Sequence, residues 1–217
     1  MNKRSLVSLH QPLFCFLFVF FLSYYFPAES FASIRSLVGY KHISLNEHFN
    51  HNTHPNDSFL PNANQSGSAG TTRIQGTSWL FLGARYLRED ENTALNIDLG
   101  GLLGRNKNKT KNANDSRPDS TASFIYSKAE MGISGAVGYS WKKGRFKWGA
   151  EAQLSAIYIE SGWDRFDNQE KEKSKIKLVP TIGPKVGITL WDDNLWEFTV
   201  QGGEAFSAGT NVQFRFW

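Results

Sequence analysis

Four of the five histidines lie close together, at His42, His48, His51 and His54. The last three follow a His-x-x-His-x-x-His spacing, and neutral imidazoles are ligands for zinc and copper. That spacing places the three rings on one face only in a helix, whereas this segment has the polar composition of a loop. The sequence therefore predicts a solvated loop, with no bound metal ion and no cofactor.

His42 and Ser44 form a second pair of chemically useful residues. Residues two apart in a strand share a face, so His42 can activate Ser44, and Glu47 can orient the imidazole. The pair resembles the His-x-Ser motif of the outer-membrane lipid A 3-O-deacylase family, in which the histidine activates the serine for ester hydrolysis. That family usually has Asn after the serine, and this chain has Leu45. We predict no enzymatic activity and keep a deacylase-like hydrolase using His42 and Ser44 as an alternative.

A third group consists of charged residues at the polar positions of segments that alternate between apolar and polar. Acidic and basic members occur in different segments, so they can pair if those segments line a narrow lumen. The predicted interior polar network contains Asp98, Glu130, Glu151, Lys177, Lys185, Glu197 and Arg215.

Strands must position these residues, because the alternation has a period of two. From Phe146 to Gly162, apolar or small side chains from Phe146 to Tyr158 occupy every second position, and mainly polar or small ones lie between them. Successive side chains of a strand point to opposite faces, whereas a helix would scatter both sets. Similar alternation recurs along most of the chain.

The connections alternate in length. Short polar turns at 88–92, 142–145 and 192–194 alternate with long polar stretches, which we predict to be loops, at 46–70, 104–121 and 164–174. Transmembrane barrels of the outer membrane have short turns at one end and long loops at the other. The sequence predicts an all-β protein, a closed antiparallel up-and-down transmembrane β-barrel of about eight strands. Pro180 and Pro184 predict a bulge in the strand that contains them.

The first 32 residues predict a signal peptide. Lys3 and Arg4 precede an apolar run from Pro12 to Phe26, and small residues flank a cleavage point before Ser33. The run is shorter than the roughly 20 residues of a spanning helix. The barrel domain is then 33–217, which has no cysteine because Cys15 is the only one. The net charge of +4 is spread along the chain, which excludes a nucleic-acid-binding stripe.

Aromatic residues gather on the apolar faces, several beside the short turns, as in the girdles of membrane barrels. The predicted outward set contains Tyr139, Trp141, Phe146, Trp148, Tyr158, Trp196, Phe198, Phe214 and Phe216. A soluble, lipocalin-like ligand-binding barrel of the periplasm is the alternative, and it would have these faces inside. Small residues and mixed charges on the polar faces favour the membrane arrangement.

The signal peptide, the alternating strands, the loop pattern and the terminal "NVQFRFW" resemble the small outer-membrane barrel families of the OmpA transmembrane domain, OmpX/Ail and OmpW. The resemblance implies location in the cell outer membrane and recognition of the C-terminal strand by the barrel-assembly machinery. A barrel in that membrane contacts outer-membrane lipids, and the long loops, rich in Asn, Lys and Asp, predict contact with lipopolysaccharide and with a host or surface ligand. We expect a structural or surface-interaction role and a plugged, largely non-conducting interior.

Overall fold

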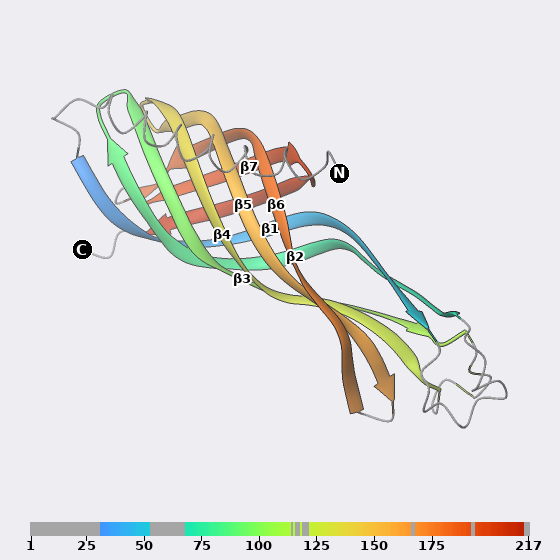
Figure 1. The fold of residues 1–217 in the computed structure, drawn as a ribbon. Coiled ribbons are helices and arrows are strands. Elements are labelled where there is room, and N and C mark those ends of the chain that lie inside the picture. The colour runs from blue at the N-terminus through green and yellow to red at the C-terminus, as the bar shows by residue number, and fades with distance from the viewer. Residues whose placement is uncertain are drawn as a thin grey trace, which may run out of the picture.

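The computed structural model describes residues 31–52, 68–113, 115, 118, 122–165, 168–191 and 194–214. These form a closed antiparallel barrel in which each strand pairs with the next and β8 returns to β1 (Figure 1). The predicted all-β, up-and-down barrel of eight strands is confirmed. The strands are β1 (Phe31–Asn52), β2 (Ser68–Glu89), β3 (Thr93–Lys111), β4 (Phe124–Lys143), β5 (Phe146–Arg165), β6 (Asn168–Thr189), β7 (Leu195–Gly203) and β8 (Ser207–Phe214).

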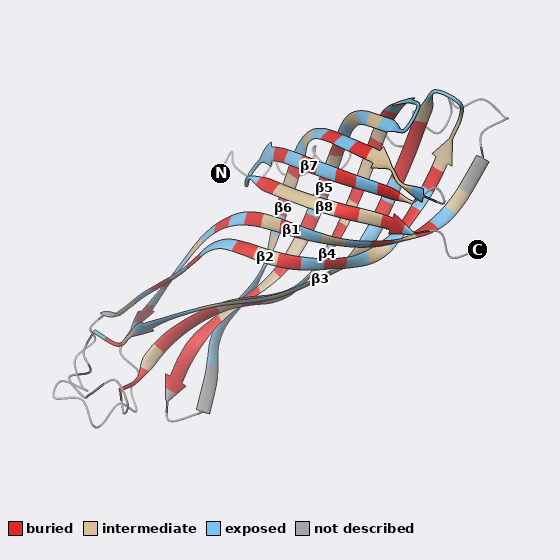
Figure 2. Cartoon of the chain, turned by 180° about the vertical axis from the view of Figure 1, so that it is seen from behind, coloured by how far each residue is buried: buried red, intermediate tan, exposed pale blue. Residues whose placement is uncertain are grey.

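Burial alternates along the strands, as the period-two pattern predicts (Figure 2). In β7, Leu195, Glu197, Thr199 and Gln201 are buried, whereas Trp196, Phe198 and Val200 are exposed. The closed barrel thus turns apolar side chains outward and encloses mostly polar ones, the reverse of an ordinary soluble barrel.

The strands differ greatly in length, and this divides the molecule into two regions. β8 pairs with β1 only from Ser36 to Ile43, and β7 pairs with β6 only from Thr181 to Thr189. Beyond these limits β1 to β6 continue without β7 and β8, as a long projection away from the short turns (Figure 1). We call this projection the extension; it comprises residues 44–52, 68–78, 105–111, 124–130, 159–165 and 168–180.

The extension is built largely from segments that the sequence predicts to be loops, so that prediction is wrong. Much of 46–70, 104–121 and 164–174 is strand, because β1 reaches Asn52, β3 reaches Lys111 and β6 begins at Asn168. Polar residues occupy the outer faces of these segments, and buried Phe49 alternates with them on β1. Sparse apolar residues at every second position are enough to give a strand a buried face.

Bulges occur where strands leave the closed barrel. The β1–β2 register shifts between Ile43 and Asn46, immediately after β1 loses its partner β8, and Gly76 has a φ of 55° there. The β3–β4 register shifts after Leu103, and the β4–β5 register shifts after Ala129. An extra residue bends a strand and increases its twist, so these bulges redirect the sheet from the barrel into the extension.

The prediction of a bulge at Pro180 and Pro184 is wrong. The β5–β6 register runs from Pro180 to Pro184 without a shift. Pro180 lies one residue beyond Thr181, where β7 pairing ends, and its carbonyl oxygen accepts a hydrogen bond from the Glu204 amide. Pro184 falls in a gap in the β6–β7 pairing. Proline lacks an amide hydrogen, and both residues occupy places where the ladder does not use one.

No helix among the described residues is long and apolar enough to cross a membrane. The predicted signal peptide falls outside the described residues except for its last two positions, and Arg215 and Trp217 also lie outside them. The division into a signal peptide and a barrel domain therefore stays a prediction.

Candidate functional site

The interior of the closed barrel is organised around Arg85 on β2. Its Nε and Nη2 each donate to one oxygen of Asp98 at 2.7 Å, which is a bidentate ion pair. Its Nη1 lies 2.5 Å from a carboxylate oxygen of Glu197 and also donates to Gln213 at 3.3 Å. Arg85 is fully buried, so it joins β2, β3, β7 and β8 through contacts that exclude solvent.

Lys185 on β6 is the second cation of this network. Its Nζ lies 3.6 Å from Glu151 and 3.7 Å from Glu197, and it donates to the side chain of Asn96. Lys41 on β1 donates to Gln153 at 2.6 Å. Three cations, Arg85, Lys185 and Lys41, thus lie among three carboxylates, Asp98, Glu151 and Glu197, and their formal charges balance. Such balance is needed, because an unpaired buried charge is strongly destabilising.

The predicted interior residues divide by position. Asp98, Glu151, Lys185 and Glu197 lie together in the network. Glu130 lies at the β4–β5 bulge, which breaks the alternation of inward and outward side chains. Its side chain is therefore partly exposed, and it forms an ion pair with Lys128 instead of joining the network. Lys177 on β6 lies in the extension, beyond Thr181, where the pairing with β7 ends. Arg215 is outside the described residues.

Sequence reasoning missed Arg85, although a signal for it exists. Arg85 has the same parity as Phe81 and Leu87, both of which are buried. The neighbouring run Trp79 to Leu82 is apolar on both faces, which hides the alternation. The indication in the sequence is that Arg85 is a charged residue at a position whose parity matches the inward-facing residues of its strand.

An apolar layer lies above the polar network, toward the extension. It is formed by buried side chains from six strands, β1 to β6, and includes Ile43, Trp79, Phe81, Leu102, Ala129, Ile157, Ile159 and Val179. Trp79 and Leu102 are fully buried. This layer separates the polar interior of the barrel from the far end of the extension.

The extension holds a third layer that contains polar groups. His51 on β1 is fully buried, and its Nδ1 lies 2.6 Å from a carboxylate oxygen of Glu172 on β6. Its Nε2 lies 2.7 Å from the hydroxyl of Ser161 on β5. Burial raises the pKa of Glu172, but its hydrogen bonds with His51 and Lys173 and the charge of Lys173 outweigh this, so the pKa is below its ordinary value.

The other histidines have different surroundings. His42 lies 3.4 Å from Ser78, while Ser44 is exposed and its amide donates to the carbonyl of Phe206. His48 is exposed, and His54 is outside the described residues. Within the described part of the chain, no three His, Cys, Asp or Glu residues are arranged to hold a metal ion.

Side chains close the extension between β1 and β6, a boundary that we call the seam. The backbone of β1 pairs with β2 and β8, and that of β6 pairs with β5 and β7. Across the seam, Glu47 forms ion pairs with Lys175 and Lys177. Lys173 donates to the carbonyl of Asn50, and His51 contacts Glu172.

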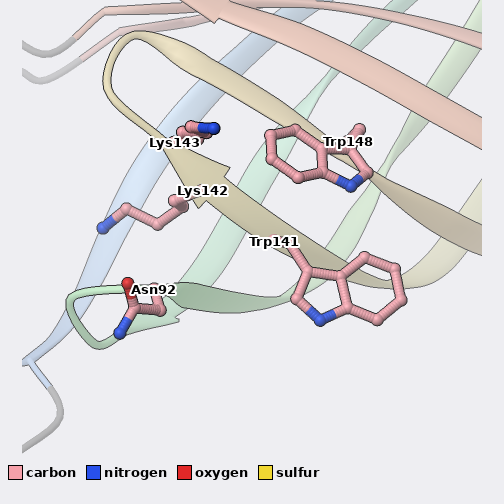
Figure 3. A pocket seen from close by; sticks show the side chains of 5 residues that line it. All are labelled: Asn92, Trp141, Lys142, Lys143 and Trp148. Carbon is pink, nitrogen blue, oxygen red and sulfur yellow. The ribbon is translucent and has the colours of Figure 1, made fainter.

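A shallow depression lies at the opposite, short-turn end of the barrel. Its volume is about 640 Å³, and Asn92, Trp141, Lys142, Lys143 and Trp148 line it. The two indole rings lie on the outer wall, with the lysines toward the turn (Figure 3). Aromatic rings beside cations suit the boundary between an apolar phase and water.

The fold and the layered interior define a class: small, up-and-down, eight-stranded barrels with an apolar outer wall and a charged interior. No protein-family model matches the sequence, and no curated protein matches it. Among solved structures, the chain is similar to Neisserial surface protein A, with 14% identity, 86% of this chain and 99% of that chain covered, and a TM-score of 0.40.

A second similar structure is Ail, the attachment invasion locus protein of Yersinia pestis, with 8% identity, coverage of 83% and 94%, and a TM-score of 0.44. A third is the toluene transporter TbuX of Ralstonia pickettii, with 10% identity, coverage of 88% and 70%, and a TM-score of 0.24. All three TM-scores are below 0.5.

Proposed function

We propose that this chain is an integral outer-membrane barrel with a plugged interior, which presents the extension on the cell surface. The observation that carries the proposal is a change in polarity along the outer faces of β1 and β2. On β1, exposed Val38 and Tyr40 give way to exposed Ser44 and Asn46 where the extension begins. On β2, exposed Leu80 and Leu82 give way to Gln75 and Arg73.

An outward apolar belt surrounds the whole barrel below that change. It includes Leu99, Leu103, Met131, Ile133, Leu154, Ile182, Val186, Phe198 and Val200, all exposed. A soluble, ligand-binding barrel needs the opposite arrangement, since its apolar side chains must line the cavity. Lipid around the belt removes this surface from water, and the closed ladder leaves no backbone edge in the hydrocarbon.

Strand length supports the same placement. β7 and β8 have 9 and 8 residues, close to the roughly 9–11 that a tilted strand needs to cross a bilayer. Exposed aromatic residues mark the short-turn end, namely Trp141, Phe146, Trp148, Trp191 and Trp196. They form an interfacial girdle there, and Lys142 and Lys143 lie within reach of lipid phosphates.

Two layers of interior side chains, the polar network and the apolar layer, support a plugged interior. Arg85 and its partners fill the barrel with mutually paired groups, and the apolar layer around Trp79 and Leu102 lies above them. An eight-stranded barrel is just wide enough to be filled by side chains. Bulk ion conduction requires both layers to be displaced.

The extension is the part available for surface interaction. Its outer face carries exposed lysines, among them Lys109, Lys171, Lys173 and Lys175. Anionic lipopolysaccharide and an acidic surface ligand are the partners that this charge suits. Recognition of the C-terminal strand by the assembly machinery remains a prediction, since residues 215–217 lie outside the described range.

Fractionation and conductance test this proposal together. The full-length chain, expressed in a Gram-negative host, should sediment with outer membranes and migrate differently on gels before and after heating. Purified protein in planar bilayers should show no stepwise conductance. Recovery in a soluble periplasmic fraction would refute the membrane placement, and regular conductance steps would refute the plug.

A further inference from the structure

We infer that Ser161, His51 and Glu172 form a serine-hydrolase site for carboxylic esters in the extension. Two hydrogen-bond contacts connect these residues: Ser161 Oγ lies 2.7 Å from His51 Nε2, and His51 Nδ1 lies 2.6 Å from a carboxylate oxygen of Glu172. A hydrogen bond from Nδ1–H to the carboxylate leaves Nε2 unprotonated and facing the serine. The inference goes beyond the proposed surface role and departs from our expectation of a non-enzymatic barrel.

Three strands supply the three residues, which favours a fixed geometry. Ser161 is on β5, His51 on β1 and Glu172 on β6, and both Ser161 and His51 are fully buried. The His51 and Trp163 rings meet in a T-shaped contact, with 6.1 Å between the ring centroids and an interplanar angle of 77°. Trp163 and Ile125 form a small apolar cluster separate from the main core. An apolar acyl group suits these surroundings.

Ser127 is a second, independent observation at the site. It lies directly opposite Ser161 in the β4–β5 register and is fully buried. Its Oγ has no hydrogen-bond partner within the described part of the structure. Directly paired residues have Cβ atoms about 4.5–5.5 Å apart. The Ser127 hydroxyl is therefore placed to donate to an oxyanion that forms on a carbonyl held at Ser161.

The chemistry is acyl transfer in two halves. Ser161 Oγ attacks the carbonyl carbon and its proton passes to His51 Nε2. The oxyanion collapses, the bond to the alcohol oxygen breaks, and the alcohol leaves with the proton from His51. Water then attacks the acyl-serine with His51 again taking the proton, which releases the carboxylic acid and restores Ser161. Glu172 is a positioning residue that holds the imidazole.

A substrate reaches this site only when the extension opens. The apolar layer closes the route through the barrel, and Ser161 is covered. The seam opens most readily, because side chains rather than a backbone ladder join β1 to β6 there. Weakening the seam at Glu47, away from the three site residues, should therefore speed access to Ser161.

The test uses the full-length protein folded in detergent micelles and an alkyl fluorophosphonate, which labels activated serines. We expect the adduct on Ser161 by peptide mass spectrometry and none on Ser155, a buried serine bonded to Ser134 and Gln153. His51→Gln should slow labelling at least 100-fold, in keeping with the contribution of a general base. Glu47→Gln should raise the labelling rate.

Hydrolysis of short p-nitrophenyl esters gives the second readout. Ser127→Ala should lower kcat about 100-fold with little change in KM, as loss of one oxyanion donor does. Glu172→Gln should lower activity, and Glu172→Asp should partly restore it, which a purely structural role does not require.

Each variant is first checked for the heat-dependent gel shift, so that a folding failure is recognised separately. Absence of the adduct in folded protein, including folded Glu47→Gln, would overturn the inference. Labelling that His51→Gln does not slow would also overturn it. Either result leaves the membrane proposal standing, because that proposal is tested by fractionation.

Discussion

The closed barrel and the extension are built from the same strands but are held together differently. Around the barrel, backbone hydrogen bonds join every neighbouring pair of strands, including β1 and β8. In the extension, β1 and β6 meet through Glu47, Lys173, Lys175 and His51 instead. The barrel can therefore be rigid while the extension opens locally, since exposed side-chain ion pairs are individually weak.

The interiors differ as well. The barrel encloses a charge-balanced network around Arg85, whereas the extension encloses apolar side chains and then the His51 group. Removing one member of the network leaves a buried charge, while changing a seam residue leaves its partner near water. The two regions should thus respond to substitution on different scales.

The largest effect should come from Arg85→Ala. This change leaves Asp98 and Glu197 buried without their main cation, and breaking a buried ion pair costs about 3–5 kcal/mol. The free energy of unfolding in urea, measured in lipid vesicles, checks this. Arg145→Ala, which removes an exposed arginine at a short turn, is the control and should change it by less than about 0.5 kcal/mol. Equal losses would show that the network does not hold the barrel.

Leu102→Ala should follow, because Leu102 is fully buried in the apolar layer. Truncating a buried leucine to alanine lowers the free energy of unfolding by about 2–5 kcal/mol. Leu103 is its matched control, since it is 53% exposed and points outward from the same strand. Leu103→Ala should cost clearly less in the same unfolding titration. The opposite order would mean that the inward and outward faces are assigned the wrong way round.

Glu47→Gln should have a smaller and local effect. It removes the ion pairs with Lys175 and Lys177, and such pairs contribute about 0.2–1 kcal/mol each. Amide hydrogen exchange should become faster in 44–52 and 168–180 and stay unchanged in 36–43. Glu91→Gln, in an exposed turn, should alter neither. Uniformly faster exchange would contradict independent opening of the extension.

Acidification should produce the smallest effect, through Asp164 in the extension. Burial raises its pKa, but the hydrogen bonds and charges of Lys109 and Lys107 outweigh this and lower the pKa below its ordinary value. Asp164 thus stabilises the folded state above its unfolded pKa of about 3.9, and this contribution is lost as pH falls below that value. Exchange in 105–111 and 159–165 should accelerate below about pH 4. Asp164→Asn should reduce that acceleration, and an unchanged pH profile would exclude Asp164 as its cause.

The fold could largely be predicted from the sequence, because alternation is a local property. Phe146 to Tyr158 alternate without interruption, and β5 begins at Phe146 as expected. The length of the extension could not be predicted in the same way. Asn and Lys dominate the outer face of β1 and β3 there, and such a segment resembles a loop when its buried apolar residues are as few as Phe49 in 46–52.

The candidate sites show the limit more clearly. Asp98, Glu151, Lys185 and Glu197 follow the alternation, so their inward positions were predictable, whereas the bulge that displaces Glu130 has no local signal. Ser161 lies 110 residues from His51 in the chain, and no spacing rule joins residues so far apart. His51 was noticed for its neighbours His48 and His54, but its partners are a serine and a glutamate on other strands.

The short pairing between β1 and β8 has a consequence for the order of folding. It joins residues about 170 positions apart, whereas β1–β2, β3–β4 and β5–β6 are hairpins between chain neighbours. The entropy of bringing ends together grows with the length of chain between them, and distant pairings form slowly. We therefore expect closure to limit the refolding rate. A sheet that includes the extension, with its Ser36–Ile43 edge still unpaired, should precede the finished barrel.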